Sequence, residues 1–456
     1  MLRKTVISIL MIFLVLVAAP LWAQQGNNES AEPIDPQEIN AENVPIVTPS
    51  DLIDQAFEEF KKKKGIEFGA LGNGGKIYYA SKSVVNSTPT NSQWAKARVN
   101  AFENAFLSIQ RDFIIDMFGK QVVKKSQDIF EDQSDDAEEF IELDESKTKL
   151  ASIWDKLVAL EGAKLDKALE ELGVDPEGFK AMPLKQKKAT FISKMTKNIL
   201  TSAIGDSTGL MPIQTFEGKD DKGNHVVGVI AMYSPKLKQL AYDISRNRSP
   251  LLKNKTGKPI KDQIPSDDVT LSKQFGVRVV FNENGQACVV SFGQWSHNYT
   301  GENTRKLERR RESATENAFD EANASITEFL SERIMFERER TKGEFSEESV
   351  VKNPDSFISR EDVDKILDKI SSKLKMQAKA DLAGITTIKK WRYTSPYGQE
   401  LIGVIRVWTL DTADTVNSVR KWKPDMKREE SGIKEEKIKT EAGVESGKDF
   451  INVDDF

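Results

Sequence analysis

The sequence repeats itself, and this constrains the possible folds more than any other feature. The segment Ala101–Phe106 matches Ala314–Phe319 at five of six positions, and Arg98 and Arg311 stand at the same offset before the two segments. Two further pairs align in the same order: Gly75–Tyr79 with Gly285–Val289, and Gly223–Ile230 with Gly398–Ile405. Matches at three separated places predict two tandem copies of one structural unit.

Each copy has the same order of expected elements. Alternating apolar residues beside Gly- and Asn-containing turns predict a β-hairpin at each end of a copy. Alanines four residues apart predict a long helix that packs closely on a sheet. The expected strands are Ile66–Leu71, Lys76–Val85, Met211–Phe216 and Val226–Tyr233, then Phe275–Phe281, Gln286–Trp295, Thr386–Tyr393 and Leu401–Trp408; the expected long helices are Trp94–Phe118 and about Arg305–Glu337.

This order predicts an α+β fold of two tandem duplicated units, each a small antiparallel-rich sheet with helices on a face. Val227–Ile230 and Ile402–Ile405 are apolar at successive positions, so we expect them to be central strands. The first copy also carries a helical insertion at about 125–205, with helices expected at Leu150–Leu172 and Leu184–Ile204. The second copy has one helix there, near Glu361–Ala378.

The first 23 residues have the pattern of a secretory signal peptide. Arg3 and Lys4 precede an apolar run that ends before Ala23, a small residue that suits signal peptidase. A retained membrane anchor is the alternative, because the run is close to the minimum length of a span. Pro20 and the polar stretch after Ala23 favour cleavage. We therefore expect export to the periplasm or beyond, and no integral membrane span after cleavage.

The remaining segments follow from composition. Residues 24–49 are rich in Asn, Glu, Pro and Gln and predict a disordered leader, after which Ser50 is expected to cap a helix that stops at Gly65. The first repeat is expected at 50–240, the second at 265–420, and a disordered charged tail at 421–456. This tail ends in an acidic, aromatic stretch, which has two interpretations: a docking tag or a frayed terminus.

Composition excludes several classes of function. Cys288 is the single cysteine, which excludes an intramolecular disulfide and cysteine-based zinc or iron–sulfur sites. Two histidines, His225 and His297, leave little room for histidine-ligated metals. The formal net charge of −5 gives no electrostatic reason to expect nucleic-acid binding. We expect no cofactor and no metal.

One motif suggests catalysis. Gly205–Gly209 fits G-x-S-x-G, the nucleophile elbow of serine hydrolases, which requires a strand before the serine and a helix after it. Here an expected helix precedes Ser207 and a hairpin follows, and neither His225 nor His297 is well placed as a base. A helix end followed by a turn explains the glycines better.

Three clusters have a functional and a structural interpretation. The acidic run Glu131–Glu145 suits a divalent cation but lacks spaced ligands and a turn glycine, which favours a solvated linker. A basic cluster suggests contact with anionic lipid or polysaccharide, although neighbouring glutamates favour a charged outer helix face: Arg305, Lys306, Arg309, Arg310 and Arg311. An aromatic set suggests sugar stacking, although strand alternation favours packing: Trp295, Trp391, Tyr393, Trp408 and Trp422.

The layout of hairpin, Ala-rich helix and returning hairpin resembles the α/β domain of small bacterial surface lipoproteins and of the N-terminal part of the flagellar T-ring assembly protein. The residues that carry this resemblance are Trp94–Arg98, Ala101 and Ala105, with their counterparts Arg311, Ala314 and Ala318. The organisation is also similar to uncharacterised exported proteobacterial proteins known as a domain of unknown function. The resemblance implies a fold and transfers no catalytic residue.

We therefore expect an exported, non-enzymatic binding or assembly module of the bacterial cell envelope, with no catalytic, cofactor-binding or metal-ligating residue. Its expected partner is an envelope protein or a second copy of itself. The alternatives are a secreted serine hydrolase that uses Ser207 and a structural subunit of an envelope complex. The identity of the partner or ligand, the oligomeric state and the role of the insertion do not follow from the residues.

Overall fold

The structure is a computed structural model that describes residues 47–130 except 92, residues 153–154, residues 163–341 except 247, 255–256 and 298, residues 359–377 and residues 384–421. The expected signal segment 1–23, nearly all of the leader, the acidic run and nearly all of the tail lie outside these ranges. No helix of the described residues is long and apolar enough to cross a membrane.

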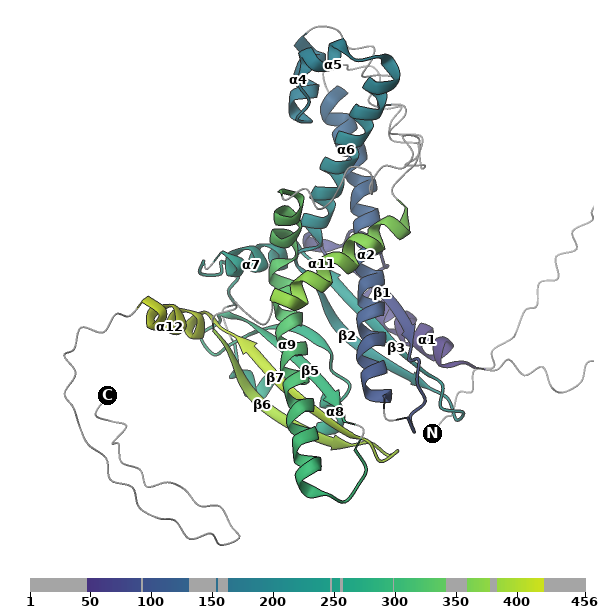
Figure 1. The fold of residues 1–456 in the computed structure, drawn as a ribbon, viewed down its shortest axis with the longest axis vertical. Helices are drawn as coiled ribbons and strands as arrows, with labels where there is room; N and C mark the ends of the chain where they lie inside the picture. Colours follow the sequence, from purple (N-terminus) through teal and green to yellow (C-terminus); the bar gives the residue numbers. More distant parts are fainter. Residues whose placement is uncertain are drawn as a thin grey trace, which may run out of the picture. The chain divides into compact units, whose positions relative to one another are not determined.

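Two separate antiparallel sheets confirm the predicted α+β class and its two units (Figure 1). The first sheet has the order β1-β3-β2 and the second β4-β5-β7-β6. The central positions of β3 and β7 confirm the prediction from their unbroken apolar runs. The strands are β1 Ile77–Val84, β2 Leu210–Lys219, β3 His225–Tyr233, β4 Gly276–Phe281, β5 Ala287–Ser296, β6 Ile385–Thr394 and β7 Glu400–Trp408.

The two long helices begin where the sequence predicted, and both extend beyond their expected ends. The remaining helices are shorter, and two of them, α7 and α12, do not belong to the repeat pattern (Figure 1). The helices are α1 Pro49–Lys64, α2 Trp94–Phe130, α4 Ala163–Glu171, α5 Pro176–Ala181, α6 Leu184–Ser207, α7 Pro235–Ser245, α8 Asp268–Leu271, α9 Thr304–Thr341, α11 Arg360–Gln377 and α12 Leu410–Lys421. Short 3₁₀ turns lie at Asn73–Gly75 and Ile260–Gln263.

Two local predictions are wrong. The expected strand Ile66–Leu71 does not form: only isolated bridges join Phe68 to Tyr78 and Leu71 to Ile77, because Gly69 has a φ of +76° and interrupts the extended backbone. The cap of α1 is Thr48, whose side chain accepts from the Asp51 amide, while Pro49 occupies the first turn and Ser50 lies inside the helix.

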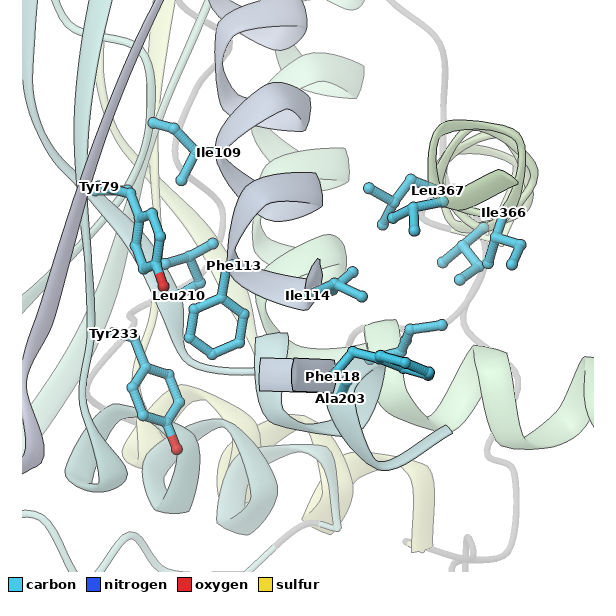
Figure 2. Close-up of a cluster of buried hydrophobic side chains, with 14 of the residues drawn as sticks. Tyr79, Ile109, Phe113, Ile114, Phe118, Ala203, Leu210, Tyr233, Ile366 and Leu367 are labelled. Atoms are coloured by element: carbon cyan, nitrogen blue, oxygen red, sulfur yellow. The ribbon is translucent and has the colours of Figure 1, made fainter. Parts of the chain in front are cut away.

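Helices cover the sheets on the faces where the apolar residues lie. In the first sheet, α1 packs Ile53 and Phe57 against one face of β3, and α2 packs against the other. In Figure 2, Ile109 and Phe113 of α2 point toward Tyr79, Leu210 and Tyr233 of this sheet, and Ile114 and Phe118 lie toward α6 and α11. This cluster joins the insertion helices to the first sheet.

The alanine stripe of α9 brings this helix onto the second sheet. Ala314, Ala318 and Ala322 are buried, and a Cβ on Gly293 of β5 would lie 2.0 Å from the Ala318 carbonyl oxygen. The close approach confirms why the sequence has small residues at that spacing. The described residues from Thr48 onward cluster as one compact unit, so both repeats share a continuous core.

Candidate functional site

A buried arginine joins the two repeats. Arg98 of α2 is 1 % exposed and forms a fork of hydrogen bonds to Glu217 of β2. Its other donors reach the second repeat, at the Ser272 carbonyl oxygen (2.7 Å) and the Gln294 side chain (3.5 Å). The guanidinium also lies 5.4 Å from the centre of the Phe275 ring.

The carboxylate of Glu217 is the centre of this network. Burial alone raises its pKa, but the charge of Arg98 and the hydrogen bond with His225 outweigh burial and hold the pKa well below its usual range. Burial lowers the pKa of His225, whose Nδ1 accepts a hydrogen bond of 3.0 Å from Trp94. His225 is therefore a neutral structural group, and its Nε2 lies 3.4 Å from Glu217.

The second repeat has its own Arg–Glu–His cluster. Arg311 binds Glu400 with both Nε and Nη2 at 2.8 Å, and His297 Nε2 donates to the same carboxylate at 2.8 Å. The Tyr299 amide donates to His297 Nδ1, which fixes the tautomer. Both ring nitrogens of His297 are thereby occupied, so this histidine positions its neighbours and has no open nitrogen for a substrate.

A polar hollow of about 240 Å³ lies beside this cluster, between the two repeats. We call it the basic hollow. The first repeat contributes side chains from the start of α2, and the second repeat contributes side chains from the end of β5 and the first turns of α9. The lining residues are Gln93, Lys96, Trp295, Ser296, His297, Arg310, Ser313, Ala314 and Asn317.

The described lining of the basic hollow carries positive charge and no carboxylate, and the nearby carboxylate of Glu400 is bound by Arg311 and His297. Lys96 and Arg310 form no ion pair with any described residue. The Lys96 ammonium lies 5.8 Å from the ring centre of Trp295. Two cations that face a cavity without an acidic partner are a chemical setting for an anion.

Hydrogen bonds hold the rim of the hollow in place. Gln399, in the turn between β6 and β7, donates to the carbonyl oxygens of Pro89 and Asn91 just before Gln93. The Tyr397 ring of the same turn packs edge-on against Trp94 at 6.0 Å. The two repeats therefore contact each other beside the hollow through specific hydrogen bonds and ring packing, as they do at Arg98.

The other sequence-level candidates are placed differently. Ser207 is in the last turn of α6, buried, and its hydroxyl donates to the Ile204 carbonyl oxygen at 2.7 Å; neither described histidine is among its partners. Burial in the second sheet raises the pKa of the Cys288 thiol to about 11. No group of three or more His, Cys, Asp or Glu among the described residues is arranged to hold a metal ion.

The structure separates the aromatic set and divides the basic cluster. Trp391 packs on Gly403 in the core, Trp408 is buried on the opposite face of the sheet, and Trp422 lies outside the described residues. Of the described members of this set, Trp295 lines the hollow. In the basic cluster Arg310 lines the hollow, whereas Arg311 is bound to Glu308 and Glu400.

Sequence reasoning missed Lys96 and Gln93 as members of the hollow. Nothing in the sequence brings the start of α2 to the start of α9, because that contact depends on how the two repeats pack. The sequence contains a weaker indication of the contact between the repeats at Arg98, since Arg98 is a charged residue within an apolar helix segment and has a counterpart at Arg311.

Comparisons with known proteins give a family model and a solved structure that are similar to parts of this chain. The sequence profile of a family described as Domain of unknown function (DUF6844) matches residues 150–246. The fold is similar to the crystal structure of a hypothetical protein from Francisella tularensis, with 21% sequence identity, a TM-score of 0.49, and coverage of 83% of this chain and 95% of that chain. None of the curated proteins matches the chain.

Proposed function

We propose that the protein is an exported, non-enzymatic binding module of the bacterial cell envelope, with the basic hollow as its ligand site. The observation that carries the proposal is the pair Lys96 and Arg310, one from each repeat, which face a cavity without an acidic partner among the described residues. A ligand that neutralises both cations contacts both repeats at once.

The hollow suits binding better than catalysis. His297 lines the hollow with Ser296 and Ser313, but both of its ring nitrogens are engaged, with Glu400 and with the Tyr299 amide, so neither is open to take a proton from a serine. General acid–base catalysis requires a group that takes or gives a proton within hydrogen-bond distance of the reacting atom. Ser207, the residue of the hydrolase alternative, is buried and donates to a backbone carbonyl.

Export is supported by the pattern of Met1–Ala23. Expression in a bacterial host with envelope fractionation tests it, together with the mass of the mature protein. Recovery from the periplasm with a mass that lacks residues 1–23 agrees with export and cleavage. Recovery of the full-length chain from the cytoplasm contradicts the proposed location.

Binding of defined probes tests the ligand site. Purified protein is titrated with anionic and neutral oligosaccharides and with anionic and neutral phospholipid vesicles. We expect an anionic probe to bind the wild type and its affinity to fall as salt increases.

The double variant Lys96→Glu/Arg310→Glu removes both cations of the hollow and is expected to abolish binding. Arg305→Glu/Arg309→Glu makes the same change in net charge at exposed α9 positions that do not line the hollow, and binding is expected to persist. Equal loss in both double variants contradicts a site at the hollow. Regular rings or fibres of the purified protein, without probe binding, favour the structural-subunit alternative.

A further inference from the structure

We infer that the ligand of the basic hollow is an acidic sugar, a pyranose ring that stacks on Trp295 and places its carboxylate between Lys96 and Arg310. The inference rests on the proposed function and specifies the chemistry of the same site. Three features of the hollow lead to it: an aromatic face, paired cations, and a rim of hydroxyl and amide groups.

The indole of Trp295 forms a wall of the hollow that a ring can stack on. It is partly exposed at the end of β5, where it also packs against the Ala318–Ala322 part of α9. The Lys96 ammonium lies 5.8 Å from the centre of this ring. The ammonium lies over the ring face as a cation–π contact, so a sugar ring that stacks on this face moves Lys96 aside. An acidic substituent of the sugar then replaces that contact with a charge-assisted hydrogen bond to the Lys96 ammonium.

Arg310 supplies the second half of the anion site. It comes from α9, on the second repeat, while Lys96 comes from α2, on the first. A guanidinium presents two parallel N–H donors that match a carboxylate. A carboxylate bound by Lys96 and Arg310 neutralises both cations. It also links the two repeats, in addition to the hydrogen bonds from Gln399 to Pro89 and Asn91.

The remaining lining groups select a polyhydroxylated ligand. Gln93, Ser296, Ser313 and Asn317 offer amide and hydroxyl groups that both donate and accept hydrogen bonds. Apart from Trp295, Ala314 is the lining residue with an apolar side chain. An acyl chain finds little apolar surface here, and the volume of about 240 Å³ accommodates a single sugar ring.

Calorimetric titration with trigalacturonic acid and its methyl ester tests the inference. The two probes share rings and hydroxyl groups and differ in charge. We expect the acid to bind at least tenfold more tightly than the ester, because the ester loses the charge-assisted bonds. Arg310→Met is expected to weaken binding of the acid by about tenfold to a hundredfold.

Variants of Trp295 test the stacking. Trp295→Leu is expected to lose about tenfold in affinity, whereas Trp295→Phe retains part of the stacking and loses less. Arg305→Met, on the same helix outside the hollow, is the matched control for Arg310→Met and should bind as the wild type does. If Trp295→Leu does not fold, Trp295→Phe and the acid–ester comparison on the wild type still decide the question.

Inorganic phosphate and citrate separate the two levels of the proposal. If either anion displaces trigalacturonic acid as well as the acid itself does at equal concentration, the hollow recognises negative charge alone. The acidic-sugar inference is then overturned, while the proposed anion site stands. If the methyl ester binds as tightly as the acid, the carboxylate charge does not contribute to binding, and both the acidic-sugar inference and the proposed anion site are wrong. If trigalacturonic acid does not bind but an anionic vesicle does, the acidic-sugar inference is likewise overturned.

Discussion

Arg98→Met is expected to cost about 4 kcal/mol of unfolding free energy, because removal of one partner of a buried ion pair costs about 3–5 kcal/mol. The side chain of Arg98 is 1 % exposed and that of Glu217 is 6 % exposed. Methionine fills similar space but leaves the Glu217 carboxylate buried without its main counter-charge. It also leaves the Ser272 carbonyl oxygen without this donor.

Arg311→Met is the matched control. Arg311 is the equivalent residue of the second repeat and binds Glu400, but its side chain is 26 % exposed and that of Glu400 is 16 % exposed. Water screens this pair, so we expect a loss of about 1 kcal/mol. The difference of about 3 kcal/mol between the two variants comes from burial rather than from the chemistry of the pair.

Urea unfolding followed by circular dichroism measures both losses. The double variant Arg98→Met/Glu217→Leu removes both charges and is expected to recover at least about 2 kcal/mol relative to Arg98→Met, because it leaves no unpaired buried carboxylate. The reasoning is refuted if Arg98→Met costs no more than Arg311→Met, or if the double variant is less stable than Arg98→Met.

Three further predictions concern the fold. Thr48→Ala is expected to destabilise the protein by about 1 kcal/mol because it removes the cap of α1, whereas Ser50→Ala is expected to cost far less. Equal urea unfolding midpoints of the two variants would contradict Thr48 as the cap. Gly293→Ala forces β5 away from α9 and is expected to cost about 1–3 kcal/mol in the same assay; a wild-type midpoint contradicts that contact. The pKa values of His225 and Glu217 are lower in the folded protein than in the unfolded chain, so protonation favours unfolding. The stabilising contribution of His225 is therefore lost as pH falls below about 6.5, and that of Glu217 as pH falls below about 4.3. The melting temperature should therefore fall on acidification from pH 8 to 4, and a rise is the opposite of what these shifts require.

The fold was largely predictable because the duplication doubles each signal. The hairpin Met211–Tyr233 has a weak pattern by itself, but its alignment with Thr386–Trp408 supports both. The central position of β3 and β7 follows from apolar residues at successive positions, since both faces of such a strand must be covered. The helix spacing of alanines predicted the close approach that Gly293 now shows.

The errors have local physical causes. Ile66–Leu71 has strand-like composition, but Gly69 adopts a positive φ and ends the extended conformation. Ser50 and Thr48 are both good caps, and Pro49 decides between them, because proline favours the first helical position and Thr48 precedes it. The sequence placed a helix end and a turn at Gly205–Gly209, where α6 ends and β2 begins.

The candidate site was only partly predictable. Arg310 and Trp295 were singled out by charge and by aromatic character, each as one member of a larger cluster. Their partner Lys96 is about 200 residues away in the chain and belongs to the other repeat. Which cations lack an acidic partner depends on the packing of side chains, as the contrast between neighbouring Arg310 and Arg311 shows.

The indole N–H signals of the six tryptophans that remain after removal of residues 1–23 give, in a nitrogen-15 NMR spectrum, the most direct test of a ligand site at the basic hollow. Trp295→Phe assigns one signal by its disappearance, and trigalacturonic acid is then added to the wild type. The account predicts that the Trp295 signal shifts with saturation while the buried Trp154 and Trp408 signals stay in place. A ligand that binds without moving the Trp295 signal contradicts the account.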